Sequence, residues 1–149
     1  MALCLSENQV KGYDFMTNTQ TKENFGEQQA QAQLSSIKEM VQLYESADAL
    51  NSSEALEEAE RRIYEAPLSV EIRSEWHTPG SKVSGGQYKI LLCTGGPAVQ
   101  IVGELDEYNQ PMDAKLQYQD WFTPWNDFSV SSADAEILLT FAGRFYYEE

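Results

Sequence analysis

The fold class follows from residues 88–105, which read YKILLCTGGPAVQIVGEL. Residues 88–93 are a compact apolar run with the length of a buried strand, and residues 99–105 are a second one. Between them, glycine and proline in residues 94–97 interrupt regular structure, which is a strong turn signal. The segment therefore predicts two antiparallel strands joined by a short turn.

Two more strands flank this pair. Residues 68–74 and residues 114–119 each alternate apolar with polar side chains, as half-buried strands do. Residues 107–111 turn the chain before the last of these strands. Because short links join the last three strands, an antiparallel meander of four strands is the most economical arrangement.

Before the strands, apolar residues recur at the three- and four-residue spacing of a helix. The first such stripe lies in residues 34–44, and a run rich in glutamine and alanine at residues 27–33 can extend that helix towards its N-terminus. Asn51 and Glu54 have the form of a capping box for a second helix, which Pro67 stops. The short link between the two predicts an antiparallel helical hairpin.

A last helix follows the strands, because Ser131 and Asp134 resemble another capping box. The core stripes that we predict for the three helices are Leu34, Ile37, Met40, Val41 and Tyr44; Leu56, Ala59 and Ile63; and Ile137, Leu138, Phe141, Ala142 and Phe145. We therefore expect an α+β fold with an N-terminal helical hairpin, a four-stranded antiparallel sheet and a C-terminal helix packed on the sheet. The length of 149 residues predicts a single domain at residues 27–149, after a loosely ordered arm at residues 1–26.

Acidic residues dominate the charge of the chain. There are 24 acidic and 10 basic side chains, for a net charge of −14, and this excess argues against binding nucleic acid or an anionic membrane directly. Residues 45–65, with seven acids and two bases, and residues 104–149, with ten acids and two bases, hold most of it. Either these acids form an ordinary solvated face, or they form a surface that docks on a basic partner.

Aromatic residues cluster in residues 120–128, which read DWFTPWNDF. Trp121 and Trp125 in this cluster either close the end of the sheet against the last helix or act as anchors in a protein interface. Tyr108, beside a predicted turn, is another candidate anchor.

Residues for common catalytic and zinc sites are few. The chain has one histidine, His77, and two cysteines, which we expect to be free thiols, with Cys93 buried in a strand. Glycine-rich phosphate loops and a GxSxG serine motif are absent from the sequence. Glu104, Asp106 and Glu107 at a strand end offer oxygen ligands for a hard cation, although a solvated turn explains them equally well. We expect no enzymatic activity and no cofactor.

Three stretches of the sequence are the most distinctive: PLSVEIR at residues 67–73, ILLCTGGPAV at residues 90–99, and LQYQDW with TPW at residues 116–125. Through them the chain resembles short acidic proteins encoded by phages, plasmids and other mobile elements. The resemblance implies an inhibitor of host defence, of the anti-CRISPR or anti-restriction type, which acts in the cytoplasm of a bacterial host. It carries no catalytic motif, so no functional residue is transferred.

Charge and resemblance together favour a non-enzymatic phage or mobile-element protein that binds a basic, nucleic-acid-binding surface of a host defence nucleoprotein through an acidic face, with DNA mimicry as one mode. The predicted partner-binding residues are Glu54, Glu57, Glu58, Asp106, Glu107 and Asp120 for charge, and Tyr108, Trp121 and Trp125 as anchors. The protein itself would be a monomer or a homodimer. Two alternatives stay open: a structural or housekeeping module of a mobile element that acts as an interaction dimer, and a divalent-cation-dependent hydrolase.

Overall fold

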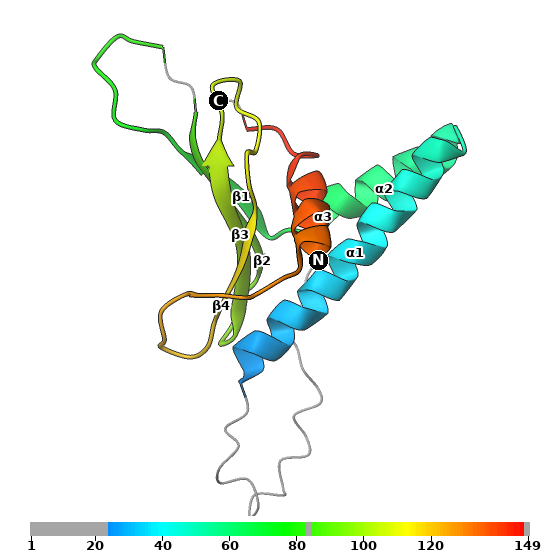
Figure 1. Ribbon diagram of the computed structural model, residues 1–149, viewed down its shortest axis with the longest axis horizontal. Coiled ribbons are helices and arrows are strands. Elements are labelled where there is room, and N and C mark those ends of the chain that lie inside the picture. Colours follow the sequence, from blue (N-terminus) through cyan, green and yellow to red (C-terminus); the bar gives the residue numbers. More distant parts are fainter. Residues whose placement is uncertain (1–23, 83–84, 148–149) are drawn as a thin grey trace, which may run out of the picture.

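The computed structural model describes residues 24–82 and residues 85–147 (Figure 1). Helices come first and last in the chain, with the strands between them. The elements in chain order are α1 (Phe25–Ala49), α2 (Ser53–Glu65), β1 (Ser69–Arg73), β2 (Gly86–Cys93), β3 (Ala98–Leu105), β4 (Lys115–Gln119), β5 (Asn126–Asp127) and α3 (Ser132–Ala142). This is the predicted α+β arrangement of a helical hairpin, a sheet and a closing helix.

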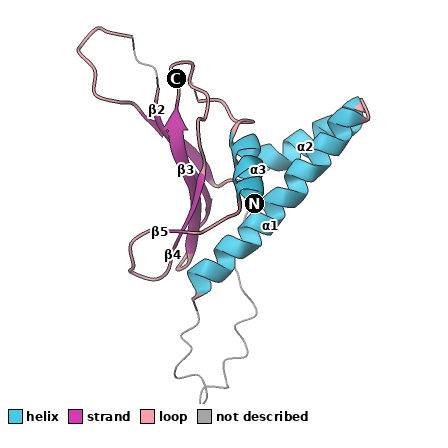
Figure 2. Cartoon of the chain, in the orientation of Figure 1, coloured by secondary structure: helices cyan, strands magenta, loops and turns pink. Residues whose placement is uncertain are grey.

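The five strands form one antiparallel sheet in the order β1-β2-β3-β4-β5 (Figure 2). The predicted meander is therefore confirmed, but the predicted number of four strands is wrong. The additional strand, β5, has only two residues, which pair with Gln117 and Tyr118. A strand this short has no measurable alternation, so the sequence pattern did not reveal it.

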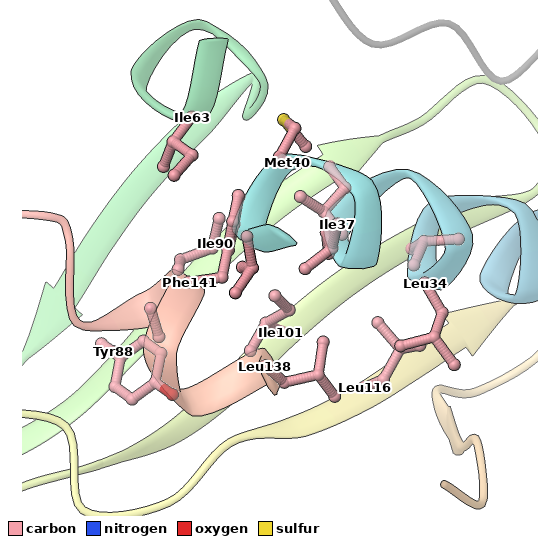
Figure 3. Packing of buried hydrophobic residues seen from close by; sticks show 14 of the residues in the cluster. Leu34, Ile37, Met40, Ile63, Tyr88, Ile90, Ile101, Leu116, Leu138 and Phe141 are labelled. Atoms are coloured by element: carbon pink, nitrogen blue, oxygen red, sulfur yellow. The ribbon is translucent and has the colours of Figure 1, made fainter. Parts of the chain in front are cut away.

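All three helices lie on one face of the sheet, and the described chain leaves the other face open (Figures 1 and 2). Helix α1 packs on β3 and β4 and against α3, and its Gly26 lies against the ring of Tyr118. The core forms where the helical stripes meet the apolar side of the sheet, as Figure 3 shows for Ile37, Ile101 and Phe141. The predicted stripes are confirmed, since most of their members are buried and Tyr44, Ile137 and Phe145 pack against the core from its edge.

The turn between α1 and α2 differs from the predicted capping box. Asn51 has a φ of 56° and follows the end of α1, and its amide donates to the Asp48 carbonyl while the amide of Ser52 donates to Ala47. These two bonds form a Schellman motif, in which asparagine tolerates the left-handed conformation. Ser52 is the N-cap of α2 and accepts from the amide of Ala55, so the predicted cap at Asn51 is wrong by one residue.

The other two helices begin at capped residues. Ser131 accepts a hydrogen bond from the amide of Asp134, as predicted for α3. Asn24 caps α1, so Phe25, which the sequence placed in the arm, belongs to the helix. The rest of the predicted arm, residues 1–23, lies outside the described residues.

Strand β1 is more exposed than the half-buried strand that its alternation predicts. Val70 and Ile72 lie opposite the core residues Ile90 and Tyr88, yet they are 36% and 40% exposed. The cause is their position, because β1 is an edge strand whereas α1 packs on β3 and β4.

Cys93 at the end of β2 is fully buried, as predicted, but it is disulfide-bonded, so the prediction of a free thiol there is wrong. Cys4 lies outside the described residues. None of the helices between residues 24 and 147, leaving out residues 83–84, combines the length and apolarity needed to cross a membrane.

Candidate functional site

The predicted partner-binding residues lie in three separate regions. Glu54, Glu57 and Glu58 are exposed on α2; Asp106, Glu107 and Tyr108 lie in the turn after β3; and Asp120, Trp121 and Trp125 lie in the loop between β4 and β5. Since β3 and β4 are antiparallel, the last two groups lie at opposite ends of the sheet. The structure therefore does not bring all nine residues together on one surface.

The first region belongs to a longer acidic surface. Residues 39–60, which form the distal half of the helical hairpin, contain seven acidic residues and no basic one, which is half of the net charge of −14. We call this segment the acidic hairpin; its acids are Glu39, Glu45, Asp48, Glu54, Glu57, Glu58 and Glu60. All of these except Glu60, which is half-buried, are exposed. The acids of α1 join those of α2 because the two helices are antiparallel neighbours.

The acidic hairpin extends away from the rest of the molecule. In Figure 1 the turn between α1 and α2 lies at the end of the hairpin furthest from the sheet. Ala47 and Ala59 are buried in the hairpin, and such small side chains allow two helices to pack closely. Leu50 at the turn is 76% exposed, so the hairpin presents one large apolar side chain among its carboxylates.

One glutamate of the hairpin is held by an arginine. The guanidinium of Arg61 donates to the carboxylates of Glu58 and Glu65, and the hydrogen bond to Arg61, together with its charge, holds the pKa of Glu58 below its usual value. This exposed ion pair sits at the base of the acidic hairpin. It keeps Glu58 ionised but also neutralises part of its field.

In the turn after β3, the predicted partner-binding residue Asp106 has a structural role. The carboxylate of Asp106 accepts from the amides of Tyr108 and Gln110 at 2.7 and 3.0 Å. Asn109, with a φ of 60°, accepts from the amide of Gly85 at 3.1 Å and so ties this turn to the end of the β1–β2 loop. Asp106 thus shapes a turn that displays Tyr108, which is 73% exposed.

The aromatic cluster divides between core and surface. Phe128 packs against the core and Trp125 is half-buried, whereas Phe122 is fully exposed. Trp121 is 58% exposed, and its ring lies against Gly96 in the turn between β2 and β3. The cluster therefore closes the end of the sheet with one part and presents aromatic rings to solvent with another.

The open face of the sheet holds a polar groove of about 600 Å³. Its charged lining comes from four adjacent stretches of chain and balances three bases with three acids: Arg73, Lys89, Lys115, Glu71, Glu104 and Asp113. Lys89 and Glu71 form an ion pair at 3.0 Å. A groove with balanced charge does not select an anionic or a cationic ligand by its field.

The described residues do not form a metal-binding group. Within residues 24–82 and 85–147, no three histidine, cysteine or acidic side chains lie together in a way that could hold a metal ion. Asp106, one of the three acids that could offer oxygen ligands to a cation or form a solvated turn, accepts hydrogen bonds from two amides of its own turn. His77 lies exposed in the loop after β1, with Nδ1 at 3.2 Å from the carbonyl oxygen of Glu75.

The sequence did not predict the whole of the acidic surface. The acids of α1 and the exposed Leu50 were not predicted as site residues, although the absence of any base between Lys38 and Arg61 was a readable signal. A comparison of the chain with protein-family models, with curated proteins and with solved structures finds no match in any of the three.

Proposed function

We propose that this protein is a non-enzymatic inhibitor that occupies a basic, nucleic-acid-binding surface of a host defence nucleoprotein with its acidic hairpin. One observation carries the proposal: residues 39–60 extend from the body with seven acids and no base. A protruding rod of one charge sign can enter a groove that normally holds a nucleic acid, and its field speeds the encounter with a basic partner.

The hairpin also has the stiffness that such an insertion needs. Its two helices are joined by a Schellman turn and packed through buried alanines, so it pays little ordering entropy on binding. Leu50 at the tip supplies an apolar contact at the point that enters deepest. Trp121 and Tyr108 lie away from this surface and are not part of the proposed contact.

The biological test is a plaque assay. The protein is expressed in bacterial strains that carry a restriction or CRISPR system and in matched strains without it, and a sensitive phage is plated on each. The proposal predicts that plating rises only where a defence system is present. Unchanged plating on every defended strain would contradict it.

The molecular test uses the effector that the plaque assay identifies. Gel-shift titration measures whether the protein displaces the effector's DNA and whether added salt weakens that competition. Replacing Asp48→Asn, Glu54→Gln and Glu57→Gln together should weaken it about tenfold, since each exposed charge pair contributes roughly 0.5 kcal/mol.

A matched control removes the same charge elsewhere. Glu75→Gln, Glu104→Gln and Glu136→Gln neutralise three exposed carboxylates outside the acidic hairpin. This variant should compete like the unmodified protein. Equal weakening by both triple variants would show that net charge matters and that the hairpin does not, and the proposed contact would be wrong.

A further inference from the structure

The strongest unused surface of the molecule is the free edge of β1. This strand pairs with β2 on one side, and no described strand lies on the other. Exposed edges invite pairing with another chain, since their amides and carbonyls have no partner in the sheet. Natural proteins therefore shorten, charge or cover them.

The β1 edge is apolar on the side that faces the helices. Leu68, Val70 and Ile72 are 41%, 36% and 40% exposed, and all three extend the apolar side of the sheet beyond the part that α1 covers. Leu68, Val70 and Ile72 thus form an uncovered apolar strip beside a free strand edge.

The opposite side of β1 carries one acid and one base. Glu71 is ion-paired with Lys89 at 3.0 Å, and the guanidinium of Arg73 donates to Gln87. Both side chains lie on the open face of the sheet, and both are exposed. Because Glu71 and Arg73 are two positions apart on the same face, an antiparallel copy of β1 can place its Arg73 opposite Glu71 and its Glu71 opposite Arg73.

We propose that two copies of this chain pair antiparallel through β1, with Ile72 of one copy opposite Ile72 of the other. This register places Glu71 across from Arg73 of the second copy, and symmetry repeats the contact. Centring the pair on residue 71 or on residue 73 would instead place two glutamates or two arginines opposite each other, which is destabilising. Of these three registers, charge therefore favours the one centred on Ile72.

The apolar strip supports the same register. On the side that faces the helices, the two Ile72 side chains meet at the symmetry axis. The two five-stranded sheets become one continuous sheet, in which the β1 edge of each copy pairs with the β1 edge of the other. This inference concerns a different surface from the acidic hairpin and does not depend on the proposed inhibition.

The first measurement is the mass of the full-length protein by sedimentation equilibrium over a wide concentration range. A moderate salt concentration is needed, because two copies with a net charge of −14 each repel at long range. We expect a reversible dimer. A monomer at every concentration would overturn the proposal.

Two single variants test the register. Glu71→Arg places arginine opposite Arg73 of the second copy, and Arg73→Glu places glutamate opposite Glu71. Each variant alone should raise the dimer dissociation constant on the order of tenfold, because two favourable cross-strand pairs become repulsive. An equimolar mixture of the two variants should recover dimerisation, since every pair is then between opposite charges.

The control variants change charge on the same face of the sheet away from the edge. Glu104→Arg on β3 and Lys115→Glu on β4 should leave the dissociation constant unchanged. Circular dichroism checks that each variant folds, which the exposure of Glu71 and Arg73 favours. A dimer that the β1 variants do not weaken, or a mixture that stays monomeric, would show that this pairing does not occur.

Discussion

The ring of Trp121 occupies the space into which a side chain on Gly96 would extend. A Cβ on Gly96 would lie 2.3 Å from a ring carbon of Trp121, whereas a Cβ on the adjacent Gly95 would meet nothing within 4 Å. The two glycines have φ values of 117° and 114°. They therefore differ in their surroundings and hardly at all in backbone conformation.

We predict that Gly96→Ala destabilises the protein more than Gly95→Ala. Both variants force alanine into a left-handed conformation at a cost of about 1–2 kcal/mol, and Gly96→Ala adds about 1–3 kcal/mol of overpacking against Trp121. Urea denaturation gives both values. Equal losses in the two variants, with unchanged tryptophan fluorescence, would contradict the contact.

Two buried tyrosines predict how stability depends on pH. Burial raises the pKa of the Tyr88 and Tyr147 phenols well above the ordinary value of 10.0. Tyr88 donates to the Asp113 carbonyl at 2.6 Å and Tyr147 to the Ala142 carbonyl at 2.7 Å, so only the neutral phenols fit the fold. The unfolded chain therefore loses these protons at lower pH than the folded protein does.

The free energy of unfolding should thus be independent of these groups below about pH 10 and should fall above it, by up to 1.36 kcal/mol per pH unit for each tyrosine. Tyr147→Phe should make this decline shallower. Tyr146→Phe, which changes an 85% exposed phenol, should not. Denaturation midpoints measured from pH 8 to pH 12 give the slopes, and identical slopes in the two variants would refute the assignment.

At the scale of the elements, Arg144 joins the end of α3 to the base of the helical hairpin. Its Nη2 lies 3.2 Å from Oε1 of Glu60 on α2, and its guanidinium lies 4.6 Å from the ring centre of Tyr44 on α1. Both members of the ion pair are about one-third exposed. One side chain, just beyond the end of α3, thus contacts both helices of the hairpin.

We predict that Arg144→Ala loosens the acidic hairpin. The loss of a partly buried ion pair and of a cation–π contact should cost about 1–2 kcal/mol and should speed amide hydrogen exchange in α2 more than in the sheet. Arg62→Ala, which removes an exposed guanidinium from α2, is the control. Uniform acceleration across all elements would mean that Arg144 does not act locally.

The helices and strands also show which parts of the fold can be predicted from the sequence. The three helices and the first four strands were predictable because their apolar spacing is long enough to measure, and the cap at Ser131 was predictable from its own side chain. The cap of α2 was not, because Asn51, Ser52 and Ser53 are all good N-caps and the Schellman bonds depend on the path of the backbone. Strand β5 was too short to show a pattern.

On the scale of the whole molecule, the distribution of charge predicts a response to salt. Half of the net charge of −14 lies in one hairpin, so its carboxylates repel one another more than evenly spread charges would. We expect the melting temperature to rise between low and physiological ionic strength, because salt screening weakens this repulsion. Asp48→Asn with Glu54→Gln and Glu57→Gln should reduce the rise, and an equal rise in this variant would contradict the explanation.

Only part of the candidate site could be predicted from the sequence, because the arrangement of the whole molecule decides which residues come together. Spacing along the chain identified Glu54, Glu57 and Glu58 as neighbours on one helix. It could not add the acids of α1, which come near them only through the hairpin, or separate Tyr108 from Trp121, which strand direction places at opposite ends of the sheet. The exposure of β1 likewise depends on where α1 crosses the sheet.

The order of the strands in the sheet is also their order along the chain, and this has a kinetic consequence. Every strand pairs with the strand next to it in the chain, so the loop-closure entropy that slows the folding of sheets with more distant pairings stays small here. The contacts of α1 with β3 and β4 join residues that are far apart in the sequence. Hairpins of the sheet should therefore form early, and the docking of α1 on the finished meander should set the overall folding rate.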